Sequence, residues 1–247
     1  MNFFSLFKRK LIYNLKKKIL IDTESTKSDS LDFLLHHYGS DKANIFKKNQ
    51  NTGHGYSSFY EKKLGKFRKK NINILEIGSY SGASAAAFSK YFSGSNIFCF
   101  DINISNFIYK SKRIHVFGID ITNEKKLKKM LKYLFTKHKI KEFDVIIDDG
   151  SHNLSDILIG IKLLFKFVKK EGFYIIEDFK YPNYHLYNRN IKHIFIDEVL
   201  KNLELQKVIT SNMLSESDQL NLINSIKKIE NFKGNLFDSD ICFLTKK

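Results

Sequence analysis

The chain has 247 residues, of which 43% are hydrophobic, and this content suits one α/β domain with a full-size core and small additions at its ends. Its 42 basic and 26 acidic side chains give a formal net charge of +16, but most of the basic residues are lysines in a lysine-, asparagine- and isoleucine-rich composition. The charge therefore assigns no partner by itself, and we do not expect nucleic acid. The only cysteines, Cys99 and Cys242, lie in apolar, strand-like segments. They indicate buried thiols in a reducing compartment and argue against a disulfide framework or a zinc site.

The first 21 residues predict a basic amphipathic helix with no acid before Asp22. Such a helix can lie on an anionic membrane, pack on its own domain, or join a second copy in a homo-oligomer, and we slightly favour packing. No window holds the roughly 18 apolar residues of a membrane span, and the N-terminus lacks the apolar core of a secretory signal. We therefore expect a cytoplasmic protein, with a peripheral place at the inner face of the membrane as the alternative.

Residues 22–70 are predicted to be a linker followed by a helical extension. The run DTESTKSDS (22–30) contains no apolar residue and several turn formers, so we predict a polar linker there. A short helix is expected to end near Tyr38, with Gly39 as its C-cap. The segment GHGYSSFYEKKLGKF then predicts a loop that enters a second helix.

From residue 71 onward, strands and helices alternate in the pattern of a parallel sheet covered on both faces. We expect strands at 71–78, 96–102, 113–120, 143–148 and 172–178, and helices at 81–92, 123–138 and 156–168. Residues 180–193 predict a loop or an active-site cover, 193–205 a helix, and 225–232 with 239–246 an antiparallel hairpin. The predicted fold class is therefore α/β: a Rossmann-like, doubly wound, mostly parallel sheet of seven strands with an antiparallel C-terminal hairpin and added N-terminal helices.

An acid follows each of the five predicted parallel strands. These acids are Glu76, Asp101, Asp120, the pair Asp148 and Asp149, and the pair Glu177 and Asp178. Ligands of open α/β sheets bind beyond the carboxyl ends of the strands, and helix capping does not explain five acids in succession. The first loop has glycines at 78 and 82, which is not the dinucleotide spacing. An acidic edge suits a cofactor with positive charge and hydroxyls, such as a sulfonium with a ribose, or a divalent cation.

The segment LEIGSYSGAS, with Asp101 and Asp120 after the next two strands, resembles the class I S-adenosylmethionine-dependent methyltransferases. The resemblance implies that Asp101 holds the ribose hydroxyls and that Asp120 reads the adenine amino group. It makes residues 71–247 a methyltransferase domain. The remaining cofactor-binding residues that we expect are Glu76, Gly78, Ser79, Gly82, Ser84 and Asp148.

A narrower resemblance, to the metal-dependent sugar O-methyltransferases of the macrolide type, is carried by YGSDK, GHGYSSFYE, DVIIDDGSH and GFYIIEDF. Some relatives of that group are labelled cephalosporin hydroxylase-like. The resemblance implies Mg²⁺ or Mn²⁺ held by Asp149, Glu177 and Asp178, with His152 as general base. It also suggests that the segment with His54, Tyr56 and Tyr60 approaches the acceptor, although a structured loop explains these residues equally well. Tyr181, with Tyr184, His185 and Tyr187, could stack on a sugar ring.

The chemistry of methyl transfer fits these residues independently. A sugar hydroxyl is a poor nucleophile while it keeps its proton, a divalent metal acidifies a bound oxygen, and an imidazole takes the proton near neutral pH. We therefore predict an S-adenosylmethionine-dependent, metal-assisted O-methyltransferase of a sugar or glycan, in surface-polysaccharide or secondary-metabolite biosynthesis. One alternative is the same fold acting on a phosphate-type oxygen, an amine or nucleic acid. Another is a non-catalytic, membrane-associated scaffold.

Overall fold

The computed structural model describes residues 3–26, 28–181 and 194–247. They form two compact units: Met1–Asp120 with Gly234–Ser239, and Ile121–Lys233 with Asp240–Lys247. The chain thus divides after Asp120, inside the predicted methyltransferase domain. The boundaries that we predicted after residues 21 and 70 stay predictions.

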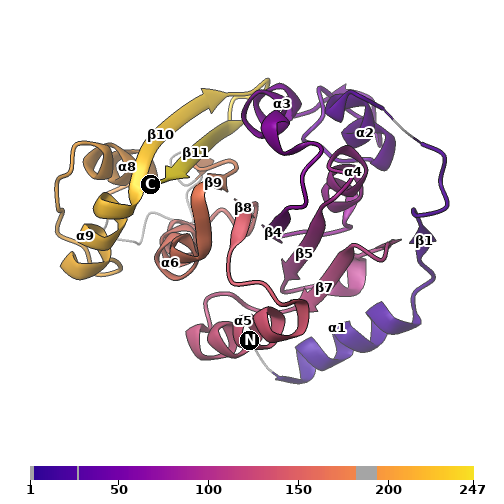
Figure 1. The fold of residues 1–247 in the computed structure, drawn as a ribbon, viewed down its shortest axis with the longest axis horizontal. Coiled ribbons are helices and arrows are strands. Elements are labelled where there is room, and N and C mark those ends of the chain that lie inside the picture. The colour runs from indigo at the N-terminus through magenta and orange to yellow at the C-terminus, as the bar shows by residue number, and fades with distance from the viewer. Residues whose placement is uncertain (1–2, 27, 182–193) are drawn as a thin grey trace. The chain divides into compact units, whose positions relative to one another are not determined.

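Three parallel strands form the sheet of the first unit (Figure 1). In spatial order they are β4 (Asn73–Ile77), β5 (Asn96–Asp101) and β7 (Ile114–Gly118). Helix α4 (Ala83–Tyr91) connects β4 to β5, and the short helix η2 (Ile104–Asn106) follows β5. Most side chains of β4 and β5 are buried, as expected of strands that are covered on both faces.

The N-terminal part of the first unit holds short elements. They are α1 (Phe3–Leu15), β1 (Ile19–Leu20), α2 (Leu31–Tyr38), β2 (Ile45–Phe46), β3 (Asn51–Thr52), α3 (Ser57–Leu64) and η1 (Gly65–Phe67). The predicted helix over 2–21 is too long, because residues 19 and 20 pair in parallel with β6 (Tyr109–Lys110) instead. Helix α2 is confirmed: the Ser30 side chain accepts a hydrogen bond from the Phe33 amide, and Gly39 ends the helix in the left-handed conformation.

The second unit combines parallel and antiparallel pairing. Strand β8 (Phe143–Asp148) lies parallel to β9 (Val168–Ile176), β11 (Asp240–Lys246) is antiparallel to β9, and β10 (Ile226–Lys233) is antiparallel to β11. Its helices are α5 (Glu124–His138), α6 (Leu154–Leu164), η3 (Phe165–Phe167), α8 (Ile196–Glu204) and α9 (Glu216–Ser225). The three strands of the first unit and these four confirm the mostly parallel α/β fold with a C-terminal hairpin.

Helix α9 was not predicted, although its start carries a recognisable signal. The Ser215 hydroxyl accepts from the Asp218 amide, and the Asp218 carboxylate accepts from the Ser215 amide. This is a capping box that uses Asp in place of the commoner Glu or Gln. The sequence therefore contained the capping-box signal for this helix, with the shorter Asp side chain at the position where Glu or Gln is commoner.

Both cysteines are buried and free, as predicted, and burial raises the pKa of each thiol well above its usual value. Among the described residues, every helix falls short of the length and apolar character needed to cross a bilayer.

Candidate active site

The loop after β4 is held in a tight turn by its glycines. Gly78 and Gly82 have φ of 82° and 80°, a region that glycine adopts without strain. The Gly78 amide donates to the Phe100 carbonyl of β5 at 2.8 Å. A Cβ atom at Gly82 would lie 2.3 Å from the Phe107 ring, so a larger residue cannot fit there. The glycines thus bring the N-terminus of α4 to the carboxyl edge of the sheet.

Asp101 ends β5 and fastens this loop from the side. Its Oδ2 accepts a hydrogen bond from the Tyr80 amide at 2.7 Å, and its Oδ1 accepts from the Asn103 amide at 2.6 Å. Tyr80 has a φ of 42° and an exposed ring, so the loop crest turns its side chain away from the carboxylate. A carboxylate has about four acceptor positions, so Asp101 keeps capacity for ribose hydroxyls.

The other predicted cofactor residues of the first unit lie around the same edge. Glu76 is fully buried, and its Oε1 accepts a hydrogen bond from the Ser84 hydroxyl of α4. The Ser79 hydroxyl donates to the Glu76 carbonyl at 3.3 Å. Asp120 is half-buried just beyond β7, where the Ile119 amide is bonded to the Asp101 carbonyl at 2.9 Å. Three acids therefore follow three adjacent parallel strands of this unit, as the sequence predicts.

In the second unit, the structure gathers Asp149, His152 and Asp178. The His152 Nε2 atom lies 3.8 Å from the Asp149 Oδ1 atom and 4.0 Å from the Asp178 Oδ2 atom. When one ligand atom is taken from each of the three residues, these atoms all lie within 4.8 Å of one another. The residues come from the ends of β8 and β9, so two neighbouring parallel strands deliver the cluster to one edge.

Two members of this cluster have an unusual backbone. His152 has a φ of 56° and Asp178 a φ of 48°. Left-handed conformations cost energy for residues with a Cβ atom and persist where the surrounding structure enforces them, commonly at functional sites. The Nδ1 atom of His152 is buried without a hydrogen-bond partner in the described structure. The imidazole is therefore held by its backbone turn and by packing near Tyr181, whose ring centre is 5.4 Å away.

The cluster fits a divalent cation. Ligand atoms about 2.1 Å from one Mg²⁺ ion can be at most about 4.2 Å apart. The two distances from Nε2 meet this limit, and the three ligand atoms together lie within 4.8 Å of one another. Two carboxylates suit Mg²⁺ or Mn²⁺. Glu177, the third predicted ligand, is buried next to Asp178 and is not a member of the cluster. The predicted ligand set of Asp149, Glu177 and Asp178, and the role of His152 as general base, thus stay predictions.

Asp148 adjoins this cluster but is not a member of it, and its carboxyl lies against α6. Its Oδ2 accepts a hydrogen bond from the Tyr174 hydroxyl at 3.0 Å, and both side chains are buried. Burial raises the pKa of Asp148 to about 7, and burial followed by the nearby carboxyl raises that of Tyr174. A Cβ atom at Gly160 of α6 would be 2.6 Å from the Asp148 Oδ2 atom and 2.8 Å from the Tyr174 hydroxyl. Sequence analysis missed Tyr174 and Gly160, although a tyrosine in an aliphatic strand signals a buried polar partner.

The predicted acceptor residues fall into different surroundings. Tyr56 and Tyr60 are fully buried, and the Tyr60 ring packs against Phe88 at 5.3 Å. The His54 ring stacks on Tyr56 at 5.3 Å, and its Nδ1 is 2.7 Å from the Ser239 hydroxyl. Tyr181 is half-buried beside His152. Contact of these residues with an acceptor stays a prediction, and Tyr184, His185 and Tyr187 lie outside the described residues.

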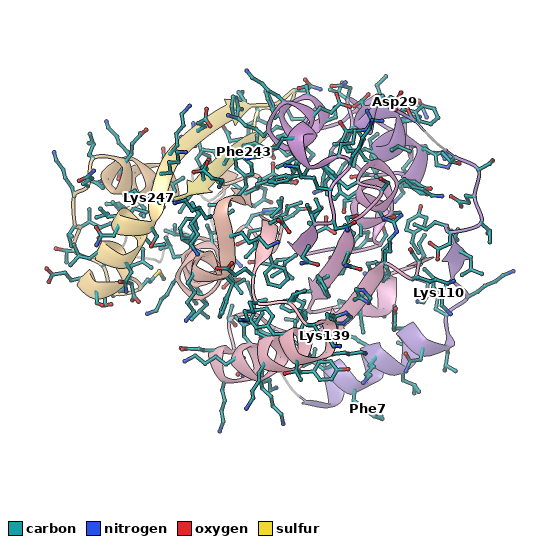
Figure 2. The ribbon with its side chains drawn as sticks, viewed as in Figure 1. Phe7, Asp29, Lys110, Lys139, Phe243 and Lys247 are labelled. Carbon is teal, nitrogen blue, oxygen red and sulfur yellow. The ribbon has the colours of Figure 1, made fainter. Side chains whose placement is uncertain are left out.

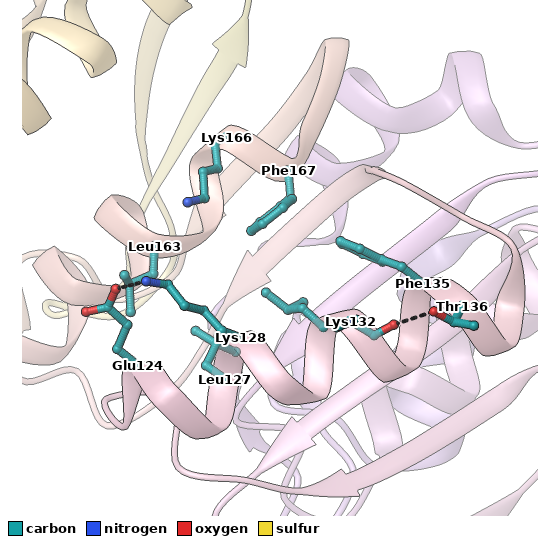
Figure 3. A pocket seen from close by; sticks show the side chains of 10 residues that line it. Glu124, Leu127, Lys128, Lys132, Phe135, Thr136, Leu163, Lys166 and Phe167 are labelled. Carbon is teal, nitrogen blue, oxygen red and sulfur yellow. Dashed lines mark hydrogen bonds and ion pairs between the residues drawn. The ribbon is translucent and has the colours of Figure 1, made fainter.

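A groove of about 310 Å³ runs along α5 in the second unit, away from the predicted site residues (Figure 3). Its wall is apolar, with Phe135 of α5 and Phe167 of η3 at 5.3 Å between ring centres. Lys128 lies at its side and is paired with Glu124 at 2.6 Å. None of the residues that carry the predicted chemistry lines this groove.

Known proteins with similar sequences are sugar O-methyltransferases, although no family model matches the chain. The chain is 26% identical over 148 residues to an 8-demethyl-8-alpha-L-rhamnosyl tetracenomycin-C 2'-O-methyltransferase of Streptomyces olivaceus. This match covers 57% of this chain and 35% of the relative. It is 28% identical over 170 residues to an L-olivosyl-oleandolide 3-O-methyltransferase of Streptomyces antibioticus, and this match covers 65% of this chain and 40% of that relative. The predicted resemblance is confirmed. The chain spans about a third to two fifths of the length of these relatives.

Solved structures agree on the fold. The MycE methyltransferase of the mycinamycin biosynthetic pathway, in complex with Mg, SAH and mycinamycin VI, superimposes with a TM-score of 0.65 at 20% identity. The match covers 90% of this chain and 55% of that one. A second crystal form of the same methyltransferase, with Mg and SAH, gives a TM-score of 0.64 at 19% identity. The chain therefore has the methyltransferase fold.

Proposed function

We propose that the chain is an S-adenosylmethionine-dependent, divalent-metal-assisted O-methyltransferase that acts on a sugar or glycan hydroxyl. The observation that carries the proposal is the grouping of Asp149, His152 and Asp178 at the ends of two parallel strands. The acids after β4, β5 and β7 and the glycine turn of the first unit support the cofactor. The names of the similar proteins, which are sugar O-methyltransferases, support the acceptor class.

The residues have separate tasks in this reaction. Asp101 and Asp120 hold the cofactor through its ribose and its adenine, and the turn at Gly78 and Gly82 lets the backbone approach it. S-adenosylmethionine would supply an activated methyl group, and a divalent ion would lower the pKa of the acceptor hydroxyl. Asp149 and Asp178, with Glu177 as the third predicted ligand, would hold that ion. His152 would take the proton of the acceptor hydroxyl as the acceptor oxygen bonds to the methyl carbon and the sulfur leaves.

The proposed place and partners follow from the same chemistry. The acceptor is a small molecule or a glycan in surface-polysaccharide or secondary-metabolite biosynthesis. Two buried free thiols support a reducing compartment, so the proposed place is the cytoplasm. The alternative place is a peripheral position at the inner face of the membrane, which would require α1 to bind lipid.

The test combines product analysis with two site variants. Nucleotide sugars and glycans are incubated with the protein, labelled S-adenosylmethionine and Mg²⁺, and methylated products are identified by mass spectrometry. Asp149→Ala and His152→Ala should each lower turnover about 100-fold or more, and both should keep cofactor affinity because the residues that we propose for the cofactor are Asp101, Asp120 and the glycine turn. His37→Ala, on α2, is the matched control and should keep full activity. Unchanged turnover in either site variant, or in excess EDTA, contradicts the mechanism.

A further inference from the structure

Helix α1 packs on its own unit through a polar and aromatic side. The Arg9 guanidinium donates to the Ile102 carbonyl at 2.8 Å, and the Lys16 ammonium donates to the Ser105 carbonyl of η2 at 3.2 Å. The Tyr13 ring meets the Phe107 ring edge to face at 6.4 Å. These contacts fasten the helix and Lys16, the residue after it, to η2 and to the chain on either side of η2. Packing on its own unit, which we slightly favoured, is therefore present on one side of the helix.

The opposite side of α1 is apolar and faces solvent. It carries an apolar ridge of four residues, Phe7, Leu11, Ile12 and Leu15, whose exposed fractions are 60%, 50%, 42% and 79%. Three of them recur every four residues, which places them on one face of a helix. Phe7 points away from the body of its unit in Figure 2. A helix that contacts its unit through polar and aromatic side chains and leaves its apolar ones exposed has the reverse of the usual orientation on a soluble domain.

The charges around the apolar ridge identify what covers it. Lys8, Lys10 and Lys17 are exposed, and the stretch holds no acid before Asp22. A second copy would bring the same lysines to the same ridge on a chain with a net charge of +16, and like charges oppose that pairing. An anionic lipid surface satisfies both features, because acyl chains accept the apolar ridge while phosphates accept the lysines.

We propose that α1 is an interfacial helix that holds the chain on an anionic bilayer. The helix lies in the plane of the membrane with the apolar ridge at the headgroup and acyl boundary. Lys8 and Lys10 contact lipid phosphates, while Arg9 and Tyr13 keep the helix fastened to its unit. This proposal does not depend on the methyltransferase activity, since it concerns a different surface and a different partner.

The experiment is flotation of the full chain with two kinds of vesicle, phosphatidylcholine alone and phosphatidylcholine with phosphatidylglycerol. The wild type should float with the anionic vesicles only, and added salt should weaken the binding. The double variant Leu11→Ser with Leu15→Ser should bind about tenfold more weakly or worse. The matched control replaces Leu205 and Leu220, two exposed leucines of the second unit, with serine and should bind like the wild type.

Each outcome decides the proposal. Selective flotation of the wild type and the control, with loss in the double variant, supports it. Absence of flotation, equal binding to both vesicles, or equal binding by wild type and double variant overturns it. Light scattering in solution adds one more arm: a wild-type dimer that the double variant dissociates would show that a second copy covers the apolar ridge, and would also overturn the proposal. All of these substitutions are at exposed positions, so thermal melting should be unchanged.

Discussion

Gly160 of α6 lies where the structure leaves no room for a larger side chain. The backbone of α6 approaches the Asp148 and Tyr174 pair so closely that a methyl group would lie 2.6 Å from the carboxylate oxygen and 2.8 Å from the phenol oxygen. Both atoms are terminal side-chain oxygens, but both side chains are buried and hydrogen-bonded to each other, so neither can move aside freely. Gly160→Ala must therefore move the helix or separate the pair.

The sign of the effect follows from opposing contributions. Alanine is favoured over glycine in a helix interior by about 1 kcal/mol. Forcing a methyl group into a filled interior costs about 1–3 kcal/mol, and a separated Asp148–Tyr174 hydrogen bond leaves buried polar groups unpaired at a cost of about 1–3 kcal/mol. The free energy of unfolding should thus fall by roughly 3 kcal/mol in Gly160→Ala.

Urea denaturation at 25 °C measures this change, with Gly65→Ala as the matched control. Gly65 ends α3 with a φ of −53°, and a Cβ atom there would meet no atom within 4 Å. That substitution should leave the protein unchanged or stabilise it by up to about 1 kcal/mol. If Gly160→Ala were as stable as the wild type, the close packing of α6 on the acid and phenol pair would be refuted.

Three further predictions concern the acids and the imidazole. In metal-free protein, Asp148 has a pKa of about 7 and holds a proton that the unfolded chain, with a pKa near 3.8, releases. The free energy of unfolding of the wild type should therefore fall between pH 4 and pH 7 by roughly 4 kcal/mol at most relative to that of Asp148→Asn. Urea midpoints that shift equally with pH in both proteins would contradict this. His152→Ala should leave the Mn²⁺ dissociation constant, measured by electron paramagnetic resonance, within about threefold if His152 is the base, and a loss of about 100-fold would make it a ligand. Asp101→Ala should weaken S-adenosylmethionine binding in isothermal titration by about tenfold or more, whereas equal affinity would remove Asp101 from the cofactor site.

The alternation of strands and helices was readable because each element carries its own period. Strand β8 matches the predicted range, and β5 and α5 match it within one residue. The last six residues of the first predicted helix, 16–21, were misread, since the apolar residues at 19 and 20 fit a helical spacing equally well. What decides their conformation is pairing with Tyr109 and Lys110, about 90 residues away, and no local pattern carries that information.

The site was predictable in position but less so in the roles of its residues. Acids at the ends of parallel strands must share an edge, so the region followed from strand boundaries alone. The membership of the cluster did not, because it depends on the left-handed turns at His152 and Asp178. Glu177 and Asp178 look equivalent in sequence, yet only Asp178 joins Asp149 and His152 in the structure.

Strand register explains how two neighbouring acids of β8 come to differ. Asp148 pairs with Ile176 of β9 and Ile146 pairs with Tyr174, so Asp148 and Tyr174 share the face of the sheet that α6 covers. Because Asp148 is still paired in the sheet, its carboxyl points into the interior, where the Tyr174 hydroxyl is its hydrogen-bond partner. Asp149 is the first residue beyond the register, and the backbone can turn it toward the edge. After β9 the chain turns away from the sheet at Asp178, which has a φ of 48°. The cluster is therefore built from the residues at which each strand leaves its pairing, and the acids that remain beside paired residues support the fold beneath it.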